Sequence, residues 1–271
     1  MKYLKNVVIF YDNLLVMSSY LISVNNQDLK NVKLLLVIVM NKYSQKDREQ
    51  IETLIKTLSI QVEIYYPDKN LGYLNGLLAG YRFSNSSSMN ESWTVFSNVD
   101  IEFGDNQIFQ KIAMLETPDD VYCVAPSVYE PRMRRFVNPQ YLERYSKKSL
   151  EFRIWVFKKN FLANSYIQLG DFISKYLNSK EKQSQYVYSA HGSFFILKKD
   201  FLKNLGKDYM SLLYSEEAFI AEEVRLAAGR VYYDNSIKII HLANESTGKL
   251  SAKRRNTYLA ESLEKIIKEY Y

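Results

Sequence analysis

Three polar side chains stand at alternate positions near the end of an otherwise apolar run, TVFSNVDIEF (residues 94–103). Because successive side chains of a strand point to opposite faces, we expect Asn98, Asp100 and Glu102 to share one face. Carboxylates fixed at the end of a strand can hold a divalent cation, and oxygen ligands suit Mg²⁺ or Mn²⁺. A strand that runs out into solvent explains the same pattern, so the rest of the chain has to decide.

A second acidic pair opens a predicted helix in SEEAFIAEEV (residues 215–224). Ser215 fits an N-cap, Glu216 and Glu217 fall in the first turn, and Gly229 is expected to end the helix. Acidic residues favour a helix N-terminus because of the helix dipole, so stability alone explains the pair. A carboxylate at this position could equally serve as a general base.

Alternating hydrophobic patterns predict how these residues are positioned. Strand-like runs NVVIFY, KLLLVIVM, QVEIYY and WTVFSN alternate with helix-like stretches at about 13–24, 45–58 and 72–84. This rhythm predicts an α/β fold with a mainly parallel sheet flanked by helices. Ligands of such sheets bind beyond the carboxyl ends of the strands, which is where Asp100 is expected.

Composition is that of an ordinary globular protein, with 271 residues and 47% hydrophobic content. The longest unbroken apolar run, LLLVIVM, is far shorter than the roughly 20 residues that cross a bilayer. The single cysteine, Cys123, excludes an internal disulfide and a thiolate zinc site, and we expect it to be packed in a strand. These features predict a cytoplasmic protein.

The net charge of +6 is concentrated in one segment. Residues 132–159 contain nine basic and two acidic residues, interleaved with Phe, Tyr and Trp. One or two basic, aromatic helices are expected over residues 140–185, and nucleic acid, an anionic membrane or a phosphorylated ligand could each be the partner. A solvated helix face explains the charges almost as well. We expect residues 140–162 to form a basic amphipathic element at a membrane that carries a lipid-linked acceptor.

Five segments, taken in order, resemble the family 2 glycosyltransferases, which have the GT-A fold and build bacterial capsule, O-antigen and other cell-surface polysaccharides. The segments are NLGYLNGLLAGY (70–81), SNVDIEF (97–103), HGSFFILKKDFL (191–202), LYSEEAFIAEEV (213–224) and SIKIIHLANESTG (236–248). They resemble the family's glycine-rich turn before the metal strand, the metal-binding strand, the acceptor-side strand, the acidic helix with the base, and the late strand that ends in histidine. The resemblance spans about residues 5–262.

The resemblance implies an inverting transfer of a sugar from a nucleotide-diphosphate donor, UDP- or dTDP-linked, to a hydroxyl of a glycan or polyprenyl-linked acceptor. It implies Glu217 as the base, with Glu216 beside it, and a Mn²⁺ or Mg²⁺ ion. The implied metal ligands are Asp100, Glu102 and His241. The implied donor-binding residues are Tyr11, Asp12, Asn41, Asn70, Gly72, Asn75, Asn98, Asp100, Gly192 and Arg254. ESTG (245–248) and Arg255 could also contact phosphate.

The chain departs from the family pattern in two places. Met40 stands where an acid usually precedes Asn41, so the nucleotide base is read differently, with Asp12 or Asn13 as a substitute contact. Asn98 replaces the first Asp of the metal motif, and an amide is a weaker ligand than a carboxylate.

The resemblance predicts a nucleotide-sugar-binding half (1–130), a basic aromatic helical insertion (131–190) and an acceptor-side half with a C-terminal helix (191–271). It places the protein in the cytoplasm, at the inner face of the plasma membrane, with no nucleic-acid partner.

Two other functions remain open at this point. A nucleotidyltransferase would use a similar sheet and metal, but it usually has a Gly-rich, basic loop after the first strand, which YDNLLVMSSY lacks. A noncatalytic module that binds nucleic acid or membrane explains residues 132–161 but leaves the acidic motifs unexplained.

Overall fold

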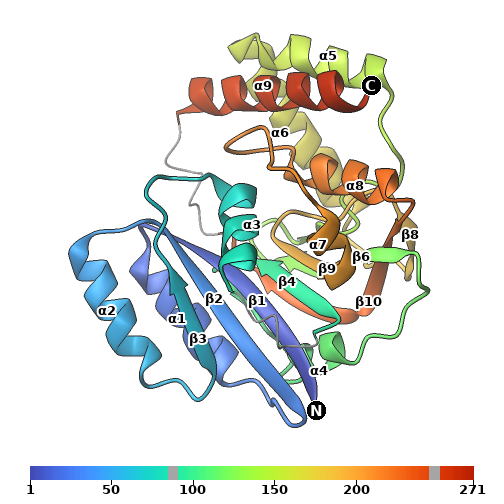
Figure 1. The fold of residues 1–271 in the computed structure, drawn as a ribbon. Helices are drawn as coiled ribbons and strands as arrows, with labels where there is room; N and C mark the ends of the chain where they lie inside the picture. Colours follow the sequence, from blue (N-terminus) through green and yellow to red (C-terminus); the bar gives the residue numbers. More distant parts are fainter. Residues whose placement is uncertain (85–90, 244–250) are drawn as a thin grey trace.

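The computed structural model describes residues 1–84, 91–243 and 251–271, and its centre is one mixed β-sheet covered by helices on both faces (Figure 1). The strand order is β3-β2-β1-β4-β9-β6-β10-β5. Two separate hydrophobic cores lie on the two faces, and neighbouring residues of β1 alternate between them, with Val7 and Ile9 in one and Val8 and Phe10 in the other. The expected α/β fold with a mostly parallel sheet is confirmed.

The first half of the chain follows the predicted rhythm closely. Strands β1 (Lys2–Tyr11), β2 (Val32–Lys42), β3 (Gln61–Tyr65) and β4 (Trp93–Ser97) are parallel to one another, and helices α1 (Leu14–Asn25), α2 (Gln45–Ile55) and α3 (Tyr73–Phe83) connect them. The chain moves from β1 outward to β3 and then returns to the other side of β1 as β4. Strand order therefore reverses at β1 and β4, and the crevice at their carboxyl ends is the expected ligand site.

The second half adds antiparallel strands. Strand β9 (Phe194–Lys198) lies antiparallel between β4 and β6 (Val121–Glu130), and β10 (Arg230–His241) runs parallel to β6. The short strands β5 (Ile101–Glu102) and β8 (Gln185–Val187) pair with β10, and β7 (Arg135–Phe136) pairs with β6. Helices α4 (Ile108–Ala113), α7 (Lys199–Asn204) and α8 (Glu216–Leu226) complete this half. Cys123 is buried on β6, as expected.

The expectation that residues 94–103 form one strand is wrong. Strand β4 ends at Ser97, because the amide of Asn98 leaves the ladder and donates to the carbonyl of Ser193 at 2.8 Å. The chain then turns, and β5 pairs with β10 instead. As a result Asp100 is buried whereas Glu102 is exposed, so the alternation that placed them on one face does not apply.

Two helices form over the basic aromatic segment, as predicted. They are α5 (Lys147–Phe157) and α6 (Asn160–Leu177), and the C-terminal helix α9 (Ala252–Tyr270) packs against both. Leu263 and Ile266 bury the inner face of α9. None of the helices in the described ranges has the length and hydropathy of a membrane-spanning segment. The proposed division at residues 130 and 190 stays a prediction.

The glycine-rich turn before α3 is a tightly packed joint. Gly72 has a φ of 80°, and a Cβ built there would lie 2.4 Å from the carbonyl oxygen of Leu212. The amide of the next residue, Tyr73, donates to that same oxygen at 3.1 Å. Only glycine fits both the backbone conformation and the close approach, so this turn fixes the loop before α8 against α3.

We predict that Gly72→Ala lowers the free energy of unfolding by about 1–3 kcal/mol, because the methyl group meets a backbone oxygen and the conformation is left-handed. Gly170→Ala is the matched control. Gly170 lies inside α6 with no atom within 4 Å of the added Cβ, so this change is expected to raise stability by roughly 0.5–1 kcal/mol. Urea unfolding of both variants measures the difference, and equal effects would contradict the packing argument.

Candidate active site

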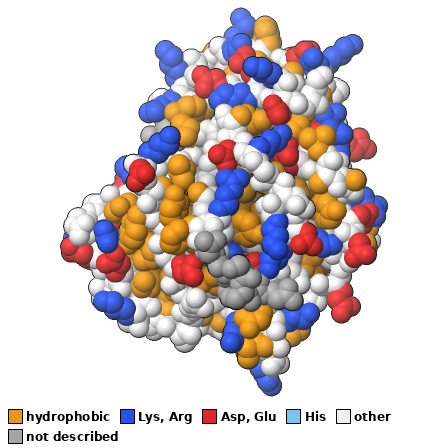
Figure 2. Space-filling view, in the orientation of Figure 1, with side chains coloured by type: hydrophobic (Ala, Val, Ile, Leu, Met, Phe, Trp, Pro, Cys, Tyr) orange, Lys and Arg blue, Asp and Glu red, His pale blue; other side chains and the backbone are white. Residues whose placement is uncertain are grey.

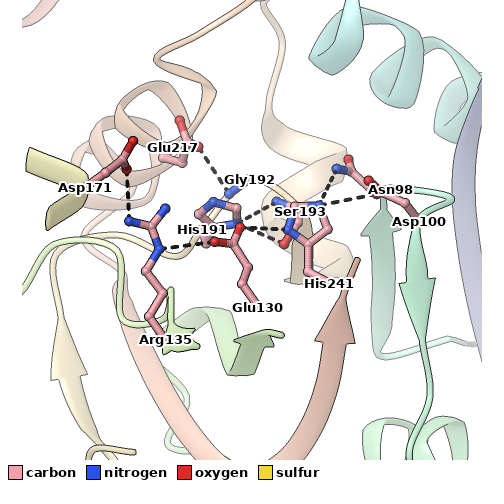
Figure 3. Close-up of polar contacts among 10 residues, drawn as sticks. All are labelled: Asn98, Asp100, Glu130, Arg135, Asp171, His191, Gly192, Ser193, Glu217 and His241. Atoms are coloured by element: carbon pink, nitrogen blue, oxygen red, sulfur yellow. Dashed lines mark hydrogen bonds and ion pairs between the residues drawn. The ribbon is translucent and has the colours of Figure 1, made fainter. Parts of the chain in front are cut away.

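The candidate site lies where the carboxyl ends of β4, β6 and β10 meet the segment before β9 and the first turn of α8 (Figure 3). Asp100 lies at one end of the cluster and Glu217 at the other, with His191, Gly192 and Ser193 between them. Residues far apart in sequence thus converge at the predicted edge of the sheet.

His241 is held between two buried carboxylates. Its Nε2 lies 3.3 Å from Oδ1 of Asp100, and its Nδ1 lies 3.1 Å from Oε1 of Glu130. All three side chains are buried. Burial lowers the pKa of His241, but hydrogen bonds to Asp100 and Glu130 outweigh it and raise the pKa to about 9. The imidazole is therefore positively charged at neutral pH in this arrangement.

Asn98 also approaches His241, with its Nδ2 3.4 Å from Nε2. A protonated Nε2 donates to Asp100 and has no lone pair left to accept a second proton, so this contact is not a hydrogen bond in the charged state. The Asn98 backbone is fixed by Ser193, and the carbonyl of Asp100 accepts from the amide of Leu242 at 2.9 Å. Asn98 is thus held by the segment before β9, and Asp100 by the residue that follows β10.

A chain of ion pairs continues from Glu130 to helix α6. Arg135 donates through Nε to Oε2 of Glu130 at 3.1 Å and through a terminal nitrogen to Oδ1 of Asp171 at 3.0 Å. Burial raises the pKa of Glu130, but the His241 hydrogen bond and the Arg135 charge prevail and lower it to about 2. Glu130 is therefore a permanent anion that anchors both neighbours.

His191 has the opposite protonation state. Burial and the charge of nearby His241 lower the pKa of His191 to about 4, so it is neutral at pH 7. The two rings lie 5.7 Å apart, and Nδ1 of His191 is 2.8 Å from Oγ of Ser193. The pair provides one charged and one neutral imidazole in the same site.

At the other end of the cluster, the carboxylate of Glu217 packs closely against Gly192. Its Oε1 accepts the N–H of Gly192 at 3.2 Å, and a Cβ on Gly192 would lie 2.8 Å from that oxygen. Burial raises the pKa of Glu217, and hydrogen bonds from backbone N–H groups, including that of Gly192, offset part of the rise. Glu217 is only partly buried, so its carboxylate can reach a ligand.

Glu216 is buried instead. Burial first, and then the charge of Glu217, raise the pKa of Glu216. The two residues before it, Tyr214 and Ser215, have φ angles of 67° and 61°, a left-handed conformation that costs energy in residues other than glycine. Ser215 makes no N-cap hydrogen bond, contrary to the expectation that it caps the helix. Strained backbone of this kind clusters at functional sites, and here it lies beside two carboxylates with raised pKa values.

Sequence reasoning missed three residues of this cluster. Tyr73 donates from its hydroxyl to the carbonyl of Gly192 at 2.8 Å, and burial followed by the charges of Glu216, Asp100 and Glu217 raises its pKa well above 10. Arg135 was predicted only as part of the basic segment 132–159, and Glu130 was not singled out. A carboxylate that ends the apolar strand VYCVAPSVYE was the available signal for Glu130.

The predicted nucleotide-contacting residues at β1 and β2 are close together. Asp12 follows Tyr11 at the end of β1 and accepts from Nζ of Lys42 at 2.7 Å. Asn41 is buried, and its amide bonds the carbonyl of Gly72 and the N–H of Leu71. The geometry gives Asn41 a role in holding the turn before α3, and its contact with a nucleotide base stays a prediction.

Two other asparagines of the glycine-rich motif also bond backbone. Asn70 accepts the N–H of Gly72 at 2.9 Å, and Asn75 bonds both the N–H and the carbonyl of Tyr209. Arg254 is exposed on α9 and donates to Tyr258 on the same helix. The predicted phosphate-binding segment 245–248 lies outside the described residues. These residues shape the site or stand beside it, and their ligand contacts stay predictions.

The donor set near Asp100 matches the chemistry of a divalent cation. A carboxylate oxygen, an amide and an imidazole converge there, and Mg²⁺ or Mn²⁺ sites that also use substrate phosphates need few protein ligands. In the described part of the chain, no three or more His, Cys, Asp or Glu side chains are already arranged to hold a metal ion. Nε2 of His241 would have to lose its proton before it could be a ligand. Glu102 is exposed on β5, and its role as a ligand stays a prediction.

Solved glycosyltransferase structures share this fold. The mannosyltransferase PcManGT of Pyrobaculum calidifontis, in complex with GDP-Man and Mn²⁺, is similar with a TM-score of 0.63 and 11% identity, over 98% of this chain and 64% of that one. GalNAc-T7 with UDP, GalNAc and Mn²⁺ is similar with a TM-score of 0.59 and 12% identity, over 97% of this chain and 48% of that one. S. aureus TarS (1–349) is similar with a TM-score of 0.57 and 11% identity, over 98% of this chain and 71% of that one.

The sequence itself matches no protein-family model and no curated protein. The chain spans less than two thirds of the mannosyltransferase and about half of GalNAc-T7. At 11–12% identity the likeness establishes a shared fold of the GT-A type.

We predict that Glu216→Gln makes the protein more stable at pH 9 but not at pH 5. A buried carboxyl with a raised pKa stabilises the fold below its usual titration range near 4.5, and that stability is lost as the pH rises through the raised pKa. Glutamine does not titrate, so the variant escapes the loss. Thermal melts at both pH values measure it. If the favourable interaction of the Glu216 charge with the helix dipole outweighs the cost of its burial, the variant's free energy of unfolding at pH 9 falls by roughly 0.3–1 kcal/mol.

Proposed function

We propose that this chain is a glycosyltransferase that moves a sugar from a nucleotide-diphosphate donor to an acceptor hydroxyl with inversion. One observation carries the proposal: Asp100 and Glu217 lie at the two ends of one polar cluster, at the carboxyl edge of a sheet with the fold of nucleotide-sugar glycosyltransferases. The cluster has the two functions that the reaction needs, charge stabilisation at one end and a base at the other.

The Asp100 end fits the leaving diphosphate. A divalent cation bound there, by Asp100 with Asn98 and His241, would neutralise the charge that builds on the diphosphate when the glycosidic bond breaks. Glu130 holds His241 in place from the opposite side, and Arg135 holds Glu130. Positioned partners of this kind orient ligand side chains and tune their basicity.

The Glu217 end fits the acceptor hydroxyl. A carboxylate that takes the hydroxyl proton makes the oxygen a better nucleophile, and attack opposite the diphosphate inverts the anomeric carbon. Burial raises the pKa of Glu217, which strengthens it as a base. The Gly192 N–H fixes one carboxylate oxygen and leaves the other available for the proton. Glu216 is too deeply buried for that role.

Finer features of the proposal rest on the sequence motifs. These are membership of family 2, a role in cell-surface polysaccharide synthesis at the inner face of the plasma membrane, and a UDP- or dTDP-sugar as the donor. A thermal-shift screen of nucleotide sugars, with and without Mn²⁺, tests the donor directly because a ligand of the folded state raises the melting temperature. A binding module without transfer activity would instead show salt-dependent binding to random DNA and no response to any nucleotide sugar.

We predict that Asp100→Asn weakens the Mn²⁺-dependent binding of UDP or dTDP at least about tenfold, because it removes a charge from the metal-binding oxygens. Isothermal titration with and without Mn²⁺ measures the effect. Glu102→Gln is the matched comparison, since Glu102 is exposed only two residues away. Metal-dependent affinity that survives in Asp100→Asn would rule out Asp100 as the ligand.

We predict that Glu217→Gln retains donor binding but lowers transfer about 100-fold or more, the usual scale for loss of a general base. Glutamine keeps the oxygen that accepts from Gly192 but cannot take a proton. Glu216→Gln is the control from the same helix turn and should keep most of its activity. Both variants are assayed for transfer and for donor binding. Equal losses of transfer in the two variants would show that the acidic pair is structural.

A further inference from the structure

The second half of helix α6 exposes apolar side chains along one face. Leu169, Phe172, Ile173 and Tyr176 follow the i, i+3, i+4, i+7 spacing of one helix face, and they are 57%, 60%, 45% and 67% exposed. Ala163 is the only residue of α6 that is fully buried. A stripe with this spacing normally faces the core.

The inward face of α6 is mixed: Leu162, Tyr166 and Ile167 pack partly buried against the core, and polar residues of the helix also contact the protein. Asp171 pairs with Arg135, and the carbonyl of Asn178, just after the helix, accepts from the amide of Phe136 at 2.8 Å. Nearer its start, Asn164 accepts from Arg255 of α9. These polar contacts fix the rotation of the helix, so the outward apolar stripe is a property of the folded chain.

The exposed stripe continues onto α5. Phe161, at the start of α6, is 82% exposed, and Phe152 and Trp155 of α5 are 54% and 52% exposed. Phe152 contacts Tyr166 of α6 and stacks on Trp155 with ring centroids 6.1 Å apart. From Leu169 to Leu177 the exposed stripe runs for about 12 Å at the usual rise of 1.5 Å per residue, and Phe152, Trp155 and Phe161 expose further apolar surface on α5 and at the start of α6. An apolar surface of this extent marks an interaction site.

Charge selects the partner. Residues 158–182 contain five lysines and two acidic residues, and both acids are engaged, Asp171 with Arg135 and Glu181 with Lys238. Lys159 lies over the ring of Trp155 at 5.4 Å. Lys and Arg side chains also project from the end of the molecule where α5 and α9 lie (Figure 2). Aromatic and aliphatic side chains flanked by lysines suit the headgroup boundary of an anionic bilayer, whereas protein interfaces are depleted in lysine.

We propose that the exposed face of α5 and α6 docks on the surface of a bilayer that contains anionic lipid. The sequence features predict this contact at residues 140–162, but most of the exposed stripe lies beyond residue 162, on α6. The Asp171–Arg135–Glu130–His241 chain joins the docking helix to the candidate site. If the proposed function also holds, docking brings the acceptor side of the site close to a lipid-linked acceptor.

Vesicle co-sedimentation tests the docking. The full chain is mixed at low salt with phosphatidylcholine vesicles, with and without about one third phosphatidylglycerol, and we expect at least tenfold stronger binding to the anionic vesicles, lost at high salt. F172S/Y176S should reduce that binding at least tenfold without lowering the melting temperature, because both side chains are exposed. L15S/I22S is the matched control, since Leu15 and Ile22 are equally exposed apolar residues on α1.

Equal binding to the two vesicle types, or unchanged binding by F172S/Y176S, overturns the proposal. So does a concentration-dependent dimer, seen by sedimentation in the absence of lipid, that F172S/Y176S abolishes, because the face would then contact a second copy. Failure of the proposed function is separable, since Mn²⁺-dependent nucleotide binding is measured without vesicles. We expect F172S/Y176S to retain it fully.

Discussion

A positive charge on His241, held between two buried carboxylates, is the interaction on which the site depends. Asp100 follows β4, Glu130 ends β6 and His241 ends β10, so one imidazolium fixes the ends of three strands. A buried ion pair of this kind contributes little net stability when complete, but removing one partner leaves an uncompensated charge and is strongly destabilising. The cluster therefore enforces one arrangement of the strand ends, and the geometry of the candidate site depends on it.

The sequence patterns were informative wherever structure is set locally. Alternating hydrophobicity placed β1 to β4 and α1 to α3 close to their observed bounds, because each element buries its own apolar residues. The break after Ser97 was not predictable in this way. It depends on the bond from Asn98 to Ser193, a residue on a strand that inserts antiparallel between β4 and β6. Glu130 was missed for the same reason, since its partner His241 comes from a distant strand.

The sequence motifs predicted where the site lies better than they predicted what each of their residues does. Asn41, Asn70 and Asn75 belong to segments that resemble a donor-binding motif, yet in the structure each uses its amide to bond backbone of the turn before α3 or the loop before α8. Short amides suit that task because they satisfy donors and acceptors at once. Similarity to a motif therefore indicates where the backbone is held in place. Contact with a ligand requires a side chain whose hydrogen-bonding groups are not already used within the protein.

Gly192 links the two halves of the site through a single residue. Its carbonyl accepts from Tyr73 on α3, and its N–H donates to Glu217 on α8. Burial, followed by the charges of Glu216, Asp100 and Glu217, raises the pKa of the Tyr73 hydroxyl well above 10, so it remains protonated and a donor at neutral pH. A donor diphosphate would add more negative charge to this region. That charge would raise the pKa of Glu217 further, so the carboxylate becomes a stronger base only once the donor is in place.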